Sequence, residues 1–285
     1  MLRFLILLFF ITTAHAATHR PHIYLKCKGT GSPTVILESG YRNDSDVWTM
    51  SLNGKPAIFP AIASFTRVCV YDRPNTIGAT IKDLSRSDKI KMPRTPESVV
   101  EELHSVLLKA HVQKPYLLVG HSLGGIFIRL YAALYPHDVA GLVLVDAYPE
   151  TFKSYLGHKY WQAYLTITKP APEGLEHYNI ENINFDDVTR VMENTEKNSP
   201  LPSIPLTVIS RGVTADLPEQ AQNILPSAAF EKAWQEGQNQ LVLLSPHAKH
   251  IIAKKSQHYV QATEPELIIN SIHEMVDEIR NAKRH

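Results

Sequence analysis

One short segment of this chain carries the residue types that acyl-transfer chemistry requires. Residues 120–125 read Gly-His-Ser-Leu-Gly-Gly and lie between two apolar runs, 115–119 and 126–133. The first run is typical of a buried strand and the second of a helix, so the segment predicts a sharp strand-to-helix turn with Ser122 at its apex. Small glycines allow the two elements to approach this closely. The Ser122 hydroxyl would then emerge at the edge of a sheet, beside the positive end of a helix dipole.

A serine nucleophile needs a base that takes its proton, and His258 is the best-placed candidate. It lies in the polar turn 256–259, after the last expected strand and before the last expected helix. Functional groups of parallel sheets gather at the carboxyl edge of the strands, where Ser122 must also emerge. The other histidines are less suitable. His121 is expected to point away from the apex, and the histidines before the last strand lie at its opposite end.

Two carboxylates could hold the imidazole in the required tautomer. Asp146 directly follows an apolar strand expected at 141–145. Asp216 lies in the loop 211–216, after the next expected strand. Both would open on the same edge of the sheet. We favour Asp146, because the end of a strand holds a carboxylate more rigidly than a long loop does.

The negative oxygen that develops during acyl transfer needs hydrogen-bond donors. The backbone amide of Leu123, at the start of the nucleophile helix, is the expected first donor. The second is expected from the turn after Glu38-Ser39-Gly40, most simply the amide of Tyr41. Because both donors are backbone groups, the shape of this turn should matter as much as the catalytic side chains.

The rest of the chain supplies the elements that would position these groups. Runs that are apolar throughout, typical of strands covered on both faces, alternate with amphipathic helices. The expected strands are residues 23–28, 34–38, 66–71, 116–119, 141–145, 206–210 and 250–253, and the expected helices include 95–110, 126–134 and 265–279. Residues 148–203 interrupt this alternation with short helical patterns and no strand, so we interpret them as an inserted cap. The predicted fold is α/β, with a mostly parallel sheet, helices on both faces and a helical cap.

The N-terminus has the three parts of a secretory signal peptide. The basic Arg3 is followed by the apolar run 4–11 and then by small residues spaced as Ala14-x-Ala16. We predict cleavage after Ala16, so that residues 1–16 are the signal and the protein is exported, periplasmic or secreted; an uncleaved N-terminal anchor is the alternative. A membrane-spanning helix needs about 20 apolar residues, and this run is shorter. No second long apolar run follows it. No integral membrane span is therefore expected after cleavage.

The charge balance argues against several classes of partner. The 29 Lys and Arg residues nearly balance the 28 Asp and Glu residues, which gives a net charge of +1. Such a surface would attract neither a nucleic acid nor an anionic bilayer. The expected partner is a small molecule that is not selected by long-range charge. Without repeats or a long linker, residues 17–285 are expected to form one domain.

With these motifs in place, the chain resembles the α/β-hydrolase fold superfamily, in particular its secreted or periplasmic branch of small esterase-like hydrolases. The resemblance covers nearly the whole mature chain. It is carried by Ser39-Gly40-Tyr41, Tyr71-Asp72-Arg73-Pro74, the 120–125 motif, Leu142-Val143-Leu144-Val145-Asp146, Ser256-Gln257-His258-Tyr259 and Glu264-Pro265-Glu266-Leu267. It also favours Asp146 over Asp216, since some members of the superfamily carry the acid one strand earlier.

The resemblance and the triad candidates together imply a serine hydrolase that cleaves a carboxylic ester through an acyl-enzyme. In this hypothesis Ser122 attacks the ester, His258 transfers the protons, Asp146 orients the imidazole, and water hydrolyses the acyl-enzyme. No cofactor is expected, and no metal, because the histidines and acids show no compact ligand spacing. Two alternatives stay open: an amidase or peptidase with the same triad, and a catalytically silent protein of this fold that binds a small molecule. Specificity is expected to come from the cap and its aromatic residues, most of which should pack the cap onto the domain.

The two cysteines, Cys27 and Cys69, lie in expected strands of a chain expected to reach an oxidising compartment. A disulfide between them is plausible there, and two buried thiols are the alternative. The bond would require the two strands to be neighbours. The resemblance implies that arrangement and so supports the bond.

Overall fold

The computed structural model describes residues 21–51, 54–78, 84–215 and 217–282. The predicted signal peptide with its cleavage site after Ala16 lies outside the described residues, and so does Asp216, the alternative acid. No helix in the described part of the chain is both long enough and apolar enough to cross a membrane.

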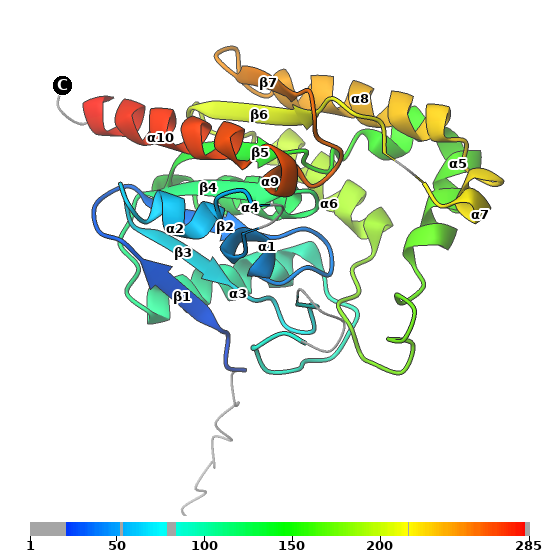
Figure 1. Ribbon diagram of the computed structural model, residues 1–285, viewed down its shortest axis with the longest axis horizontal. Coiled ribbons are helices and arrows are strands. Elements are labelled where there is room, and N and C mark those ends of the chain that lie inside the picture. The colour runs from blue at the N-terminus through cyan, green and yellow to red at the C-terminus, as the bar shows by residue number, and fades with distance from the viewer. Residues whose placement is uncertain (1–20, 52–53, 79–83, 216, 283–285) are drawn as a thin grey trace, which may run out of the picture.

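Within these residues, seven strands form one sheet in the order β1-β3-β2-β4-β5-β6-β7 (Figure 1). Only the pair of β1 with β3 is antiparallel, and the other five pairs are parallel. The strands are β1 (Leu25–Lys28), β2 (Thr34–Glu38), β3 (Val68–Tyr71), β4 (Tyr116–His121), β5 (Val139–Val145), β6 (Leu206–Arg211) and β7 (Lys249–Ala253). Each expected strand is present, with ends that differ by at most two residues from the expected ones.

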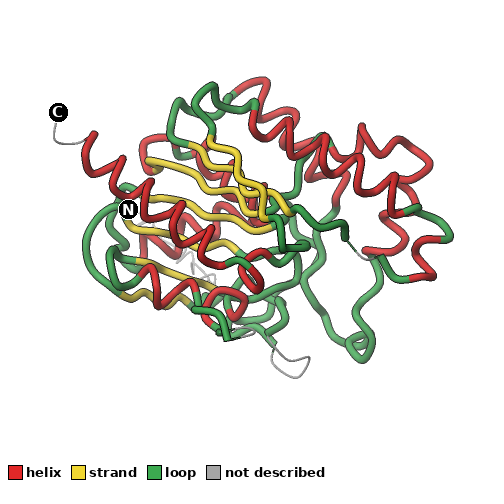
Figure 2. Tube along the Cα trace, turned by 45° about the horizontal axis from the view of Figure 1, so that its top comes forward, coloured by secondary structure: helices red, strands yellow, loops and turns green. Residues whose placement is uncertain are grey.

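Helices cover both faces of this sheet (Figure 2). The helices are α1 (Asp46–Thr49), α2 (Ile58–Ile62), α3 (Pro96–Lys109), α4 (Gly124–Leu134), the short 3₁₀ helix η1 (Pro136–Asp138), α5 (Phe152–Thr168), α6 (Phe185–Asn198), α7 (Glu219–Gln222), α8 (Ser227–Val242), α9 (Val260–Thr263) and α10 (Pro265–Ala282). The predicted α/β fold is therefore confirmed. Helix α8 has no counterpart among the expected helices, because its apolar residues are interspersed with Gln, Glu and Gly.

Two hydrophobic cores follow from the alternation of side chains along the strands. Ile36 faces the core that contains α3, α4 and α8, together with α5 and α6. Its neighbours Val35 and Leu37 face the core beneath α1, α2, α9 and α10. Because both faces of the central strands are covered, these strands are apolar throughout. Such continuous apolar runs allowed the strands to be predicted from the sequence.

Residues 146–205, all of which the structure describes, contain α5 and α6 and no strand beyond one isolated bridge between Ile183 and Arg94. In Figure 1 these helices lie on the side of the sheet to which the parallel strands point. Helix α5 packs on α8 through Phe152, whose ring centroid lies 5.5 Å from that of Trp234. The segment expected to form a cap thus covers the carboxyl edge of the strands.

Cys27 and Cys69 lie opposite each other where β1 pairs with β3. Their Cα atoms are 4.1 Å apart, and the two residues form a disulfide. The predicted bond is therefore present, and it links two strands whose contact the resemblance implied.

Candidate active site

The predicted strand-to-helix turn connects β4 to α4, and Ser122 is its apex. Ser122 has a φ angle of +53°, a left-handed conformation that is uncommon for residues other than glycine. Its amide donates to the carbonyl of Val145 (3.1 Å), and its own carbonyl accepts from the amides of Gly125 (2.9 Å) and Tyr148 (2.8 Å). The turn is therefore held on both sides by backbone hydrogen bonds, which compensate for its strained conformation.

Glycines are needed at this turn because backbones approach each other closely. A Cβ atom on Gly120 would lie 2.6 Å from the carbonyl oxygen of Gly124. A Cβ atom on Gly124 would lie 2.6 Å from the carbonyl oxygen of Ser39, on the neighbouring turn after β2. The spacing of glycines around Ser122 is therefore explained by packing against two other segments.

The structure brings His258 and Asp146 together. His258 follows β7, Asp146 follows β5, and the Nδ1 atom of His258 lies 2.6 Å from Oδ2 of Asp146. The carboxylate also accepts hydrogen bonds from Nη1 of Arg211 (2.8 Å) and from Nε1 of Trp234 (2.9 Å). Both carboxylate oxygens are thus occupied, which fixes the side chain in one orientation.

Burial alone would raise the pKa of Asp146, whose side chain is fully covered. The hydrogen bond from His258, the positive charge of Arg211 and the hydrogen bond from Trp234 outweigh burial and lower this pKa to about 2. Asp146 is therefore ionised at neutral pH, the state that holds a proton on Nδ1 of His258 and leaves Nε2 as the acceptor.

Ser122 and His258 line the same pocket of about 250 Å³, together with Tyr41 and Leu123. Within the described residues the Ser122 hydroxyl makes no hydrogen bond, so it can turn toward the imidazole or toward a bound molecule. The pocket therefore contains a serine, an imidazole oriented by a carboxylate, and the turn proposed from the sequence to supply an amide.

That turn, Ser39–Tyr41, passes directly beside Ser122. A Cβ atom on Gly40 would lie 2.9 Å from Nδ1 of His121 and 3.1 Å from Cβ of Ser122. In the described part of the chain, neither the amide of Tyr41 nor that of Leu123 donates a hydrogen bond. Both predicted donors are therefore unpaired at the edge of the pocket.

His121 has a role that the sequence did not indicate. Its Nε2 atom lies 2.9 Å from the backbone carbonyl oxygen of His258. Burial, and then the nearby charge of His258, lower the pKa of His121 to about 3, so the neutral ring donates to that carbonyl. Because Ser122 is its neighbour in the chain, His121 links the turn at Ser122 to the backbone of His258.

Half of the residues that line the pocket are aromatic, and they come from residues 148–185, from α8 and from the turns after β2 and β7. They include Tyr41, Tyr148, Tyr164, Phe185, Phe230, Trp234 and Tyr259. Among the cap aromatics noted in the sequence, Phe152 and Trp161 are buried in the core, whereas Tyr155 and Tyr178 are exposed. The contributions of α6 and α8 were missed, because no local pattern separates a side chain that faces a pocket from one that faces the core.

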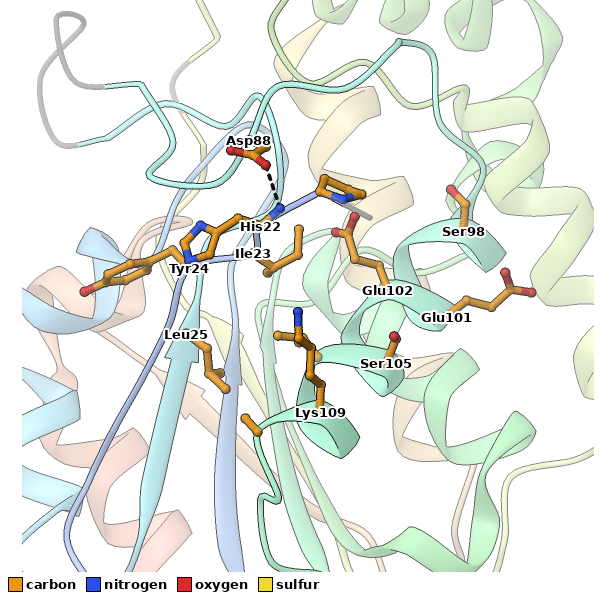
Figure 3. A pocket seen from close by; sticks show the side chains of 13 residues that line it. His22, Ile23, Tyr24, Leu25, Asp88, Ser98, Glu101, Glu102, Ser105 and Lys109 are labelled. Carbon is orange, nitrogen blue, oxygen red and sulfur yellow. Dashed lines mark hydrogen bonds between the residues drawn. The ribbon is translucent and has the colours of Figure 1, made fainter. Parts of the chain in front are cut away.

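A second pocket of about 280 Å³ adjoins the first and shares Tyr41, Thr168 and Phe185 with it. A third and larger one, of about 830 Å³, lies between residues 21–25 and α3 (Figure 3). Glu101, Glu102 and Lys109 line it, but none of Ser122, Asp146 and His258 does. Among the described residues there is no group of three or more His, Cys, Asp or Glu side chains that could hold a metal ion.

Proteins of related sequence or structure have the same fold. A family model described as the alpha/beta hydrolase fold matches residues 33–181. The chain is 26% identical to the uncharacterized protein YqjL of Bacillus subtilis (strain 168), over 87% of this chain and 85% of that protein. The fold is similar to that of mouse alpha/beta hydrolase domain-containing protein 10, with a TM-score of 0.62 and 17% identity over 92% of this chain and 96% of that chain. It is also similar to a monoacylglycerol lipase from Paleococcus ferrophilus, with a TM-score of 0.59 and 16% identity over 90% of this chain and 99% of that chain. Since the family model spans more than half of the residues, the chain belongs to the alpha/beta hydrolase fold family.

Proposed function

We propose that this protein is a serine hydrolase that cleaves a carboxylic ester through an acyl-enzyme intermediate. One observation carries the proposal: Ser122 lines the same pocket as His258, and His258 is hydrogen-bonded to the buried Asp146 behind it. A buried, ionised carboxylate that holds an imidazole beside a strained serine is an arrangement suited to nucleophilic catalysis.

In the proposed reaction Ser122 Oγ attacks the ester carbonyl while Nε2 of His258 takes its proton. The imidazolium then gives this proton to the leaving alcohol as the carbon–oxygen bond of the ester breaks, and the acyl group stays on Ser122. Water attacks the acyl-enzyme with His258 as the base again, which releases the acid and restores the serine. Asp146 remains ionised and stabilises the imidazolium in both steps.

The amides of Tyr41 and Leu123 would receive the oxyanion of each tetrahedral intermediate. Loss of one such donor typically lowers kcat by about 10²- to 10³-fold. The position of both residues on the pocket wall supports this assignment, because amides that make no hydrogen bond within the described residues are free to donate to a bound molecule.

Two observations favour an ester with an apolar group. Half of the residues that line the pocket are aromatic, and one protein of similar fold is a monoacylglycerol lipase. We further propose that the protein is exported, since the disulfide of Cys27 and Cys69 is typical of oxidising compartments.

The test uses p-nitrophenyl esters of graded acyl length with the wild-type protein and Ser122→Ala. We expect hydrolysis by the wild type and loss of activity in the variant, together with covalent labelling of Ser122 by a fluorophosphonate. Equal rates from both proteins would remove Ser122 from the mechanism. Labelling without ester turnover, but with cleavage of the matching anilides, would favour an amidase. Absence of both labelling and turnover would favour a binding protein.

A further inference from the structure

A buried arginine holds the turn that carries the Tyr41 amide. Arg73 follows β3 and is 1% exposed. Its Nη1 donates to the carbonyl of Ser39 (2.9 Å), and its Nη2 donates to the carbonyl of Gly40 (2.7 Å). Two consecutive carbonyl groups of the turn are thus bound by one rigid guanidinium group.

The bond to Gly40 has a direct consequence for the amide of Tyr41. The carbonyl of Gly40 and the N–H of Tyr41 belong to the same planar trans peptide, in which they point in opposite directions. When Arg73 fixes the carbonyl, it therefore also fixes the direction of the N–H group. This is the group proposed to receive the oxyanion.

Arg73 is in turn held by a carboxylate from the cap. Glu181 lies between α5 and α6 and is fully buried. Its carboxylate accepts from Nε of Arg73 (2.6 Å) and from Nη2 of Arg73 (2.9 Å), a bidentate pair. The same carboxylate accepts from the amide of Arg42 (2.7 Å), whose φ angle of +63° is left-handed. Glu181 therefore contacts both Arg73 and the residue that follows Tyr41.

Further contacts tie the cap to this turn. The guanidinium group of Arg42 donates to the carbonyls of Glu181 (3.2 Å), Pro170 (2.7 Å) and Lys169 (3.1 Å). On the other side, Glu38 also pairs with Arg73 and accepts a hydrogen bond from the Tyr71 hydroxyl. A buried ion pair is weak evidence of stabilisation, because desolvation opposes the Coulombic gain. Glu38 and Glu181 instead hold Arg73 against the Ser39–Tyr41 turn, which indicates that the ion pairs position this turn.

A second ion pair between cap and body provides a contrast. Glu196 of α6 pairs with Arg129 of α4 at 3.3 Å. These residues line a different pocket and make none of the contacts with the turn after β2. The two pairs thus differ in what the arginine touches.

We propose that Glu181 is a positioning residue through which the cap, acting on Arg73, sets the direction of the Tyr41 amide in the oxyanion hole. This inference rests on the proposed function. It assigns to the cap a part in transition-state stabilisation, in addition to the walls that it gives to the pocket. It adds Arg73 and Glu181 to the residues that the reaction depends on, although neither touches the substrate.

The test compares Glu181→Gln with the control Glu196→Gln, which removes a carboxylate that pairs with Arg129 and does not contact the turn after β2. In Glu181→Gln we expect kcat per fluorophosphonate-titrated site to fall by about 10- to 100-fold, with KM nearly unchanged, because the oxyanion exists only in the transition state. A trifluoromethyl ketone, which forms a tetrahedral oxyanion on Ser122, should lose affinity by the same factor. The carboxylic acid product should not.

Arg73→Lys keeps the charge but loses the fork that binds two carbonyls, so it should reproduce the defect. Arg42→Gln leaves Arg73 and Glu181 in place and is the milder second variant if either of the others fails to fold. It should give a smaller loss of the same kind. Far-ultraviolet circular dichroism checks the fold of each variant.

The outcomes separate the two proposals. A wild-type protein without Ser122-dependent hydrolysis overturns the proposed function, and this inference with it. An active wild type in which Glu181→Gln behaves like Glu196→Gln, in kcat and in ketone affinity, overturns the inference alone. A change confined to KM would also overturn it, since that change would place Glu181 in substrate binding.

Discussion

The ring of His121 donates a hydrogen bond to the backbone carbonyl of His258, 2.9 Å away. The residue next to the proposed nucleophile thus supports the residue proposed as its base. The two rings also lie close to each other, with centroids 4.7 Å apart. A change at His121 should therefore act on the position of His258 and not on its chemistry.

We predict that His121→Phe lowers kcat for an aryl ester while the protein stays folded. Phenylalanine keeps the ring in the core but removes the donor, so the carbonyl of His258 loses its partner. An unsatisfied buried group costs about 1–3 kcal/mol, which urea unfolding should detect. The control is His104→Phe, which removes a histidine that contacts Tyr131 away from the pocket. Equal kcat in wild type and His121→Phe would contradict the supporting role.

Asp146→Asn tests the carboxylate through both activity and pH. In a triad of this kind the change lowers kcat by about 10⁴-fold, because the amide stabilises the wrong tautomer of the imidazole. Asp146 also couples stability to pH, since the folded protein lowers its pKa from 3.8 to about 2.

A lowered pKa in the folded state means that the unfolded chain binds more protons between these two values. The stabilisation is therefore complete above about pH 4 and is lost as the pH falls toward 2, by about 2 kcal/mol. Urea unfolding at several pH values should show this loss in the wild type and in Asp277→Asn, whose carboxylate is half exposed. It should be smaller in Asp146→Asn. An equal loss of unfolding free energy with falling pH in all three proteins would exclude Asp146 as the source of this pH dependence.

The disulfide gives a prediction about stability. It joins residues that are 42 positions apart, and closing a loop of this length restricts the unfolded chain. We expect the Cys27→Ala, Cys69→Ala double variant to lose about 3–4 kcal/mol of unfolding free energy. A reducing agent should destabilise the wild type and leave the double variant unchanged. If a reducing agent does not change the unfolding free energy of the wild type, the bond does not form in the purified protein.

The elements around the nucleophile could be predicted because their signals are local. Apolar runs such as β4 and β5 can be predicted without knowing which strands pair with them, and the glycines beside Ser122 indicate the turn. The meeting of Asp146 and His258 followed from a general rule, since both come after parallel strands and such strand ends share one edge. The same rule fits Asp216 equally well, which is why the sequence alone did not decide which of the two acids pairs with His258.

Contacts between distant segments left no such signal. Arg73 and Glu181 are separated by 108 positions, and a single glutamate in a polar stretch is usually solvent-exposed. Its burial depends on how the cap closes over the turn after β2. Trp234 is similar, because its hydrogen bond to Asp146 depends on the packing of α8, a helix that the pattern did not reveal.

The boundary between the two adjoining pockets should control substrate length. Phe185 lines both pockets, and its ring centroid lies 5.2 Å from that of Tyr41, which also lines both. Phe185→Ala would remove this side chain and join the two spaces. Each additional buried CH₂ group contributes about 0.8 kcal/mol, so longer acyl chains should gain most from the new space.

We therefore expect the ratio of kcat/KM for p-nitrophenyl decanoate to that for the butyrate to rise by about 10-fold or more in Phe185→Ala. The variant should also lose about 3–5 kcal/mol of stability, since the phenyl ring is buried. Phe65→Ala, at a phenylalanine that packs on His273 of α10, is the control for the loss of a ring away from the pocket. An unchanged ratio in a folded Phe185→Ala protein would mean that the acyl chain does not extend past Phe185. The second pocket would then lie beyond the substrate, and chain length would be limited by the aromatic walls of the first pocket alone.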